Sequence, residues 1–133
     1  MSDLHRLLSA DSGGGLIESL EHLDRDELAA AAAQHGARFG ELHGPTSKAA
    51  LLESLREVLS LPRYTGSNWD ALEEVLAYPE RQASGPALVA WHDPRRLPTL
   101  DAGTFKAIIQ SAAEARARSG DGPLVVVAGP IAV

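Results

Sequence analysis

The sequence predicts a small layered α/β domain with a short, mostly parallel sheet of three to four strands flanked by helices. Segments with strand character alternate along the chain with segments whose apolar residues recur at helical spacing. The last apolar run, Leu124–Ala128 (LVVVA), is rich in β-branched residues and is typical of a strand covered on both faces. At 133 residues the chain is most simply one domain, with parallel strands joined by right-handed crossovers.

The N-terminal segment carries weak signals for regular structure. Residues 1–13 are expected to be a loosely attached, flexible lead that ends in the glycines of residues 13–15. Leu16–Leu20 is a candidate for a short strand.

Asp24–Gln34 is predicted to be a helix. Asp24 suits the N-cap position, Glu27 three residues later completes a box-like pattern, and an alanine run follows. Gly36 is expected to end this helix.

The middle of the chain predicts a strand followed by an amphipathic helix. Ala37–Leu42 is the strand candidate, and Gly44-Pro45 closes it. Thr46 or Ser47 is expected to cap the helix, whose leucines follow a period near 3.6, at positions 51, 52, 55 and 59. Pro62 is expected to end it.

Three further elements complete the alternation. A helix is predicted from about Trp69 to Leu76, and Ala87–Trp91 (ALVAW) is predicted to be a buried strand. Asp101 or Thr104 is expected to open a long helix that runs to about Arg118.

Composition excludes several classes of function. The formal charge of −6 disfavours nucleic-acid binding and suits a basic partner, although such a charge can also serve solubility alone. The absence of cysteine excludes disulfides and thiol chemistry. With no signal peptide and no apolar run long enough for a membrane helix, we expect a cytoplasmic protein without membrane contact.

The most informative stretch is Leu61–Leu76, LPRYTGSNWDALEEVL. Asp70, Glu73 and Glu74 lie three and four residues apart, so they share one helix face. Like charges at this spacing weaken a helix by a few tenths of a kcal/mol. Negative charge at these positions therefore indicates a requirement other than stability.

The loop before this helix adds features of a protein-recognition site. Gly66 permits unusual backbone angles, and Asn68 or Ser67 can cap the helix. Tyr64 and Trp69 add aromatic surface beside the acids, as interfaces with other proteins do.

Each of these residues also has a purely structural interpretation. Asp70 can be the acid of a capping box that begins at Ser67. Glu73 and Glu74 can form an ordinary solvated helix face, and the two aromatic side chains can belong to the core, an interpretation favoured for Trp69.

The spacing L-P-x-Y-x-G-x-N-x-D-A-L resembles the signature of barstar-type ribonuclease inhibitors. It is carried by Leu61, Pro62, Tyr64, Gly66, Asn68, Asp70, Ala71 and Leu72. The likeness extends backward through SKAALLESLREVLS and forward through ALVAW, the 101–118 helix and LVVVA, so it covers about residues 37–129. It divides the chain into an N-terminal extension, 1–36, packed on a barstar-like domain, 37–133.

The resemblance implies a non-enzymatic protein that blocks the active-site cleft of a secreted, guanyl-specific microbial ribonuclease. The expected partner is a basic ribonuclease in a 1:1 complex, with no cofactor or metal, and the free inhibitor is expected to be monomeric. Asp70 matches an inhibitory aspartate and Glu74 the principal one, while Glu114 matches a peripheral acid. The implied partner-binding residues are Tyr64, Gly66, Asn68, Trp69, Asp70, Glu73, Glu74 and Glu114.

Two departures from the family pattern concern the target. Glu74 is one methylene longer than the usual aspartate, and Glu73 stands where an aromatic residue is common. Residues 77–86 also differ from the prototype.

Two other functions remain open. An immunity or interaction protein of the same fold could neutralise a toxin that is not a ribonuclease. A small cytoplasmic enzyme is disfavoured because no catalytic motif is present and histidines 5, 22, 35, 43 and 92 show no ligand spacing. His92-Asp93 is interpreted as a surface turn, and the open end of the sheet could still hold a small ligand.

Overall fold

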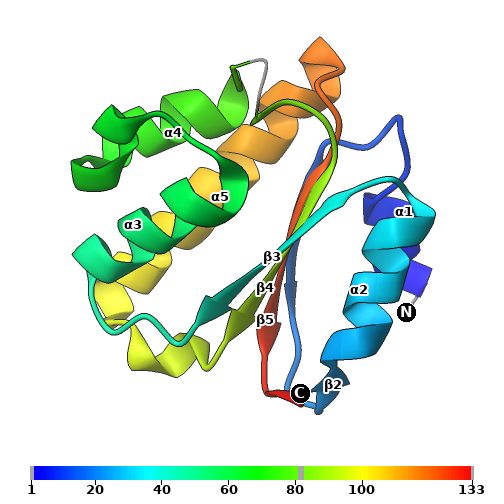
Figure 1. Cartoon of the computed structure of the whole chain (residues 1–133), viewed down its shortest axis with the longest axis horizontal. Coiled ribbons are helices and arrows are strands. Elements are labelled where there is room, and N and C mark those ends of the chain that lie inside the picture. Colours follow the sequence, from blue (N-terminus) through cyan, green and yellow to red (C-terminus); the bar gives the residue numbers. More distant parts are fainter. Residues whose placement is uncertain (1, 81–82, 133) are drawn as a thin grey trace.

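The centre of the molecule is a four-stranded parallel sheet. The computed structural model describes residues 2–80 and 83–132. The strand order is β1-β5-β4-β3, formed by Gly14–Glu18, Leu124–Gly129, Ala87–His92 and Arg38–His43 (Figure 1). Every neighbouring pair is parallel, and every residue of β4 and β5 is buried. The predicted α/β class and parallel sheet are therefore confirmed.

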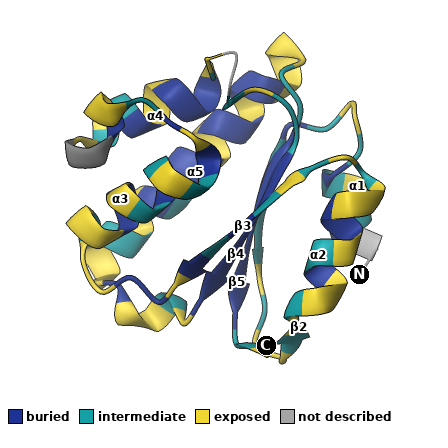
Figure 2. Cartoon of the chain, in the orientation of Figure 1, coloured by how far each residue is buried: buried dark blue, intermediate teal, exposed yellow. Residues whose placement is uncertain are grey.

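Helices cover both faces of this sheet. One face carries α3 (Lys48–Leu59), α4 (Trp69–Ala77) and α5 (Thr99–Ser119), as Figure 1 shows. The other face carries α1 (Ser2–Leu7) and α2 (Arg25–Gln34). Figure 2 shows that the helices turn buried sides toward the sheet and exposed sides outward. This arrangement explains why β4 and β5 are buried throughout and mostly apolar.

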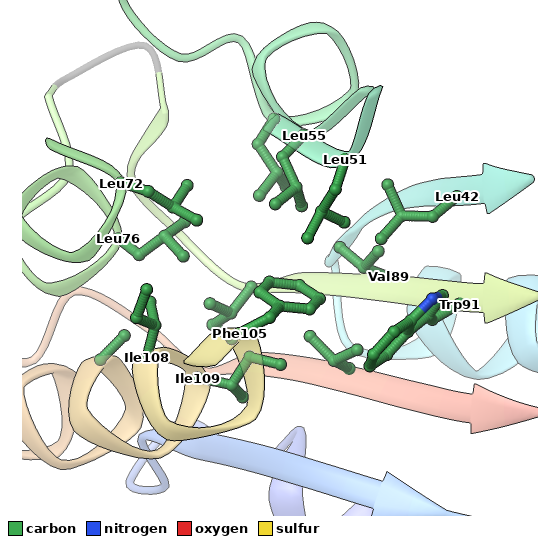
Figure 3. Packing of buried hydrophobic residues seen from close by; sticks show 14 of the residues in the cluster. Leu42, Leu51, Leu55, Leu72, Leu76, Val89, Trp91, Phe105, Ile108 and Ile109 are labelled. Carbon is green, nitrogen blue, oxygen red and sulfur yellow. The ribbon is translucent and has the colours of Figure 1, made fainter. Parts of the chain in front are cut away.

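The larger core lies between the sheet and helices α3, α4 and α5. Leucines of α3 and α4 meet apolar side chains of β4 and α5 there (Figure 3). Trp91 contacts Phe105 edge-on, with ring centroids 5.1 Å apart and an interplanar angle of 67°. Edge-to-face packing is a preferred aromatic geometry. This core fixes the inner sides of α4 and α5 and leaves their outer sides for other uses.

The second core lies on the opposite face and corrects the expectation of a flexible lead. Residues 2–7 form α1, and Leu4 and Leu8 are buried with Leu28 against the sheet residues Leu88 and Val125. Leu4 in α1 and Leu8 directly after it stand one helical turn apart, so both face the apolar surface of the sheet. The N-terminal residues are thus docked because that face needs a cover.

Helix starts follow the predicted caps in three of four cases, the third being Asn68 at the start of α4. Asp24 caps α2 and Ser47, rather than Thr46, caps α3, each by accepting a backbone N–H on its side chain. Helix α5 instead begins at Thr99, before the predicted starts at Asp101 or Thr104. Pro98 precedes it without a side-chain cap, and proline's fixed φ suits a helix entrance.

Other boundaries differ by a few residues from those predicted. Helix α3 ends at Leu59 rather than at Pro62, since Ser60 takes a left-handed φ of 55°. Strand β1 lies two residues earlier than Leu16–Leu20. A second, two-stranded sheet joins β2 (Leu23–Asp24) to β6 (Ile131–Ala132). Within the described residues, no helix combines the length and apolar character that crossing a lipid bilayer requires.

Candidate functional site

The loop that leads into α4 is built as a short 3-10 helix, η1 (Arg63–Ser67). It starts at Pro62, whose carbonyl accepts the N–H of Thr65 at 3.1 Å. Thr65 is fully buried, and Leu61 is buried in the core just before it. The loop is therefore anchored at both of these residues, which holds Tyr64 at the surface between them.

Asn68 sets the start of α4. Its side-chain Oδ1 accepts the backbone N–H of Asp70 at 2.7 Å and that of Ala71 at 3.4 Å. The cap is thus Asn68 and not Ser67, so the capping-box interpretation of Asp70 with Ser67 is wrong. The Asp70 carboxylate is left in the first turn, where the helix dipole favours a negative charge.

Helix α4 has two chemically opposite faces. Leu72, Val75 and Leu76 are buried in the core, which fixes the rotation of the helix. Figure 3 shows Leu72 and Leu76 in this core. The acid face is the set Asp70, Glu73 and Glu74, and all three side chains are exposed. None of the three forms an ion pair with any residue in the ranges 2–80 and 83–132. The face therefore presents carboxylates to solvent that the described fold leaves uncompensated.

Tyr64 lies beside this acid face. It is 56% exposed, and its hydroxyl donates a hydrogen bond to Oε1 of Glu80 at 3.4 Å. Partial desolvation raises the pKa of Tyr64, and the charges of Glu80 and Glu74 raise it further. The three side chains are thus near one another in space. The sequence did not indicate Glu80, because it lies beyond the helix, sixteen residues after Tyr64.

Trp69 serves partly as a core residue. It is half-buried and packs against the larger core, as the structural interpretation favoured. The Nζ atom of Lys48 lies 5.4 Å from the centroid of its indole ring, within the range of a cation–π contact. Trp69 thereby links the first turn of α4 to the first turn of α3 and leaves only part of its surface for a partner.

Arg116 holds the other end of α4. Its guanidinium is buried and donates hydrogen bonds to three backbone carbonyls, of Leu76 at 2.6 Å and of Gly85 and Gly122 at 3.3 Å each. Burial lowers the pKa of this group, opposed by the charge of Asp121. A cation at the carboxyl end of α4 also complements the helix dipole. Asn68 and Arg116 together fix both ends of the helix that carries the acid face.

The sequence itself carries a signal for Arg116. This residue follows Phe105, Ile109 and Ala112 at the spacing of the buried stripe of α5, so a charge occupies a core position. Glu114, two residues earlier, is exposed on the same helix. Helix α4 packs on α5, so Glu114 lies on the helix next to the one that carries the acid face.

The fold brings histidines into contact with residues that are distant in the sequence, although their spacing in the sequence is not that of metal ligands. His92 is nearly buried, and its Nε2 lies 3.1 Å from Oε1 of Glu41, which also accepts a hydrogen bond from Arg25 at 3.2 Å. The sequence predicts His92 and Asp93 together in a surface turn. Asp93 is exposed after β4, whereas His92 is the last residue of that buried strand. His5 and His35 lie with ring nitrogens 3.0 Å apart. No group of three or more potential metal ligands occurs in the described part of the chain.

Comparison with known proteins adds one match. Residues 37–128 match the model of a protein family described as Barstar (barnase inhibitor). The matched span is more than half of the chain and includes η1, α4 and α5. A search of the curated proteins finds no match.

Proposed function

The chain belongs to the Barstar (barnase inhibitor) family, and on that premise we propose that it inhibits a secreted, guanyl-specific microbial ribonuclease. It would do so by inserting the acid face of α4 and the η1 loop into the active-site cleft. The family's own description is that of an inhibitor rather than of an enzyme.

The acid face is the observation that carries this proposal. Three exposed carboxylates stand on a helix whose rotation is fixed by buried leucines and whose ends are fixed by Asn68 and Arg116. A rigid, pre-organised surface loses little conformational entropy when it binds. Its charge makes it complementary to a cleft that is built to bind RNA phosphates.

The mechanism follows from charge and geometry. Asp70 and Glu74 take the places of phosphates and pair with arginine, lysine or histidine side chains of the nuclease. Such pairs are strong when they are desolvated and hydrogen-bonded, and close charge pairs in the barnase–barstar complex are an established example of such coupling. The net charge of −6 speeds the encounter with a basic protein.

Loop residues contribute contact area around the acids. Tyr64 offers an exposed ring, while Gly66 and Asn68 offer backbone groups of η1 and its end. Trp69 contributes the part of its ring that the core leaves uncovered. Glu73 adds a further carboxylate, and Glu114 on α5 would pair with a basic residue at the rim of the cleft.

The proposal also covers the stoichiometry, the cellular location and the domain organisation of the protein. We propose a 1:1 complex and a monomeric free inhibitor that acts in the cytoplasm and protects the cell that makes the nuclease. The family match begins at Ala37, which supports a division into an N-terminal extension, 1–36, and a barstar-like domain, 37–133. The alternative is an immunity protein of the same fold whose toxin is not a ribonuclease, which Glu73 and Glu74 favour as departures from the family pattern.

A titration of barnase with the purified chain tests the proposal. We expect RNA cleavage to fall linearly and to stop at one equivalent, with weaker inhibition at high salt because charge pairs carry the contact. The double variant Asp70→Asn, Glu74→Gln should lose inhibition, whereas Glu27→Gln on the opposite side of the molecule should retain it. Full RNA cleavage in the presence of excess chain, with barnase and with a nuclease encoded beside it, would refute ribonuclease inhibition.

A further inference from the structure

A concave surface lies at the carboxyl edge of the sheet, away from the acid face. This groove has a volume of about 830 Å³ and is enclosed by the ends of β1 and β5, the turn after β4 and the first two turns of α5. Figure 1 shows α4 toward the opposite end of the sheet from the strand arrowheads. The groove is therefore separate from the proposed inhibitory surface.

Topology explains why a groove forms here. After β1 the chain turns to the face covered by α2, whereas after β4 it turns to the face covered by α5 (Figure 1). Strand β5 lies between β1 and β4, so the two connections part above its end. In open α/β sheets, ligands bind in the crevice at such a switch point, outside the carboxyl ends of the strands.

The charges in the groove favour an anion. Arg95 and Arg96 line the groove and are exposed, and neither guanidinium group forms a hydrogen bond or ion pair with any residue that the structure describes. Lys106 is already paired with Glu18 at 2.6 Å, and Asp93 is the other acid in the lining. The lining therefore includes two arginines whose guanidinium groups have no ion-pair partner among the described residues, in a chain with a net charge of −6.

Two backbone features distinguish the lining of the groove. Gly103 lies inside α5, where glycine destabilises a helix relative to alanine, yet a Cβ there would meet nothing within 4 Å. Packing thus gives no reason for glycine, while its missing side chain widens the groove. Asp93, in the turn after β4, holds a left-handed φ of 49°. Strained non-glycine residues of this kind cluster at functional sites.

We propose that this groove binds a small organic phosphate. Guanidinium groups match phosphate oxygens in charge and geometry. The apolar body of the ligand would lie against Leu20, which is 90% exposed, and against Leu97 and Pro130. The volume lies within the range of pockets for small molecules, about 300–1,000 Å³. This inference is independent of ribonuclease inhibition.

Binding is tested by amide chemical-shift titration of the full chain with adenosine monophosphate and with phenyl phosphate. We expect saturable shifts that centre on residues 93–97, 103 and 129–130 for at least one of them. The double variant Arg95→Gln, Arg96→Gln should weaken binding about tenfold or more, as expected when charged hydrogen bonds are lost. Gly103→Leu should abolish it by placing a side chain in the groove, and it should fold because a Cβ at this position meets no atom within 4 Å. Arg118→Gln, at the far end of α5, is the matched control.

Each outcome decides the proposal. Absence of saturable shifts with both phosphates overturns it, as does unchanged binding by Gly103→Leu. If inorganic phosphate binds as tightly as the organic phosphates, the groove captures an adventitious anion only. If adenosine binds as tightly as adenosine monophosphate, the arginines do not recognise the phosphate, and the proposal is overturned. The thermal midpoint of Gly103→Leu, measured in parallel, shows that the variant is folded when its binding is assayed.

Discussion

The Nε atom of Arg116 donates a hydrogen bond to the carbonyl oxygen of Leu76 at 2.6 Å, and this bond ties the end of α4 to α5. The same guanidinium reaches two further carbonyls, before β4 and before β5. One buried cation thus joins the acid-bearing helix, the segment that follows it and the turn that leads into the central strand. Its partners are backbone groups, so their identity does not depend on side chains.

Replacement of Arg116 should destabilise the fold. Arg116→Met leaves three carbonyl groups without their donor, and we expect a loss of about 3 kcal/mol in the free energy of unfolding. Urea unfolding followed by circular dichroism measures it. Arg118→Met on the exposed side of the same helix should change stability by less than about 0.5 kcal/mol. Similar losses of stability in the two variants would contradict a stabilising role for the hydrogen bonds from Arg116.

The acids of α4 should matter for binding and hardly for stability. We expect Asp70→Ala and Glu74→Ala each to weaken binding to the cognate nuclease by several kcal/mol, because the nuclease charge facing each would be left buried and unpaired. Glu74→Ala should leave the free protein equally stable or slightly more stable, since it relieves repulsion of a few tenths of a kcal/mol. Calorimetry measures the affinity and the melting temperature. Glu27→Ala on α2 serves as the control. Equal affinity of all three variants for the nuclease would contradict a role for Asp70 and Glu74 in binding.

The cap at Asn68 should link stability to recognition. Asn68→Ala removes the acceptor for two backbone N–H groups and should cost about 1 kcal/mol of folding free energy. Asn68→Asp keeps an acceptor and should retain most of that stability. Amide hydrogen exchange at Asp70 and Ala71 reports the cap directly. Unchanged exchange in Asn68→Ala would show that the side chain does not cap the helix.

Glu41 should make stability depend on acid pH. Burial favours its neutral form, but hydrogen bonds from His92 and Arg25 outweigh burial and lower the pKa of Glu41. Its contribution is therefore complete above the pKa of an unfolded glutamate, about 4.3, and is lost as the pH falls through the lower pKa of the folded state. Urea unfolding of Glu41→Gln and the parent chain should give a gap at neutral pH that closes in acid. A gap independent of pH would rule out the charged form as its source.

The sequence predicts the layers of this fold better than it predicts its small or non-local features. Four strands and four helices follow from apolar periodicity and from caps such as Asp24 and Ser47, which are local signals. Helix α1 was not predicted, because its six residues are mostly polar and give no local helix signal. Its stability comes from the packing of Leu4 against the sheet. The β2–β6 pair joins segments more than a hundred residues apart in the chain, so no local pattern could reveal it.

The candidate site likewise has features that local sequence predicts and features that only the fold reveals. Asp70, Glu73 and Glu74 could be placed on one face from spacing alone, and their exposure agrees with that placement. The contacts of Tyr64 with Glu80 and of His92 with Glu41 depend on the approach of distant segments and on strand register. Arg116 was visible in the sequence as a charge within an apolar stripe, but its carbonyl partners come from three segments that only the fold brings together.

The sheet lies between two cores that share no side chains. Leu72, Val75 and Leu76 of α4 pack on one side, while Leu4 and Leu28 pack on the other. Substitutions in well-separated sites usually act additively. The surface of α4 can therefore be changed without a compensating change in the second core around Leu4 and Leu28. Substitutions on the surface of α4 and in the second core should therefore have additive effects on stability.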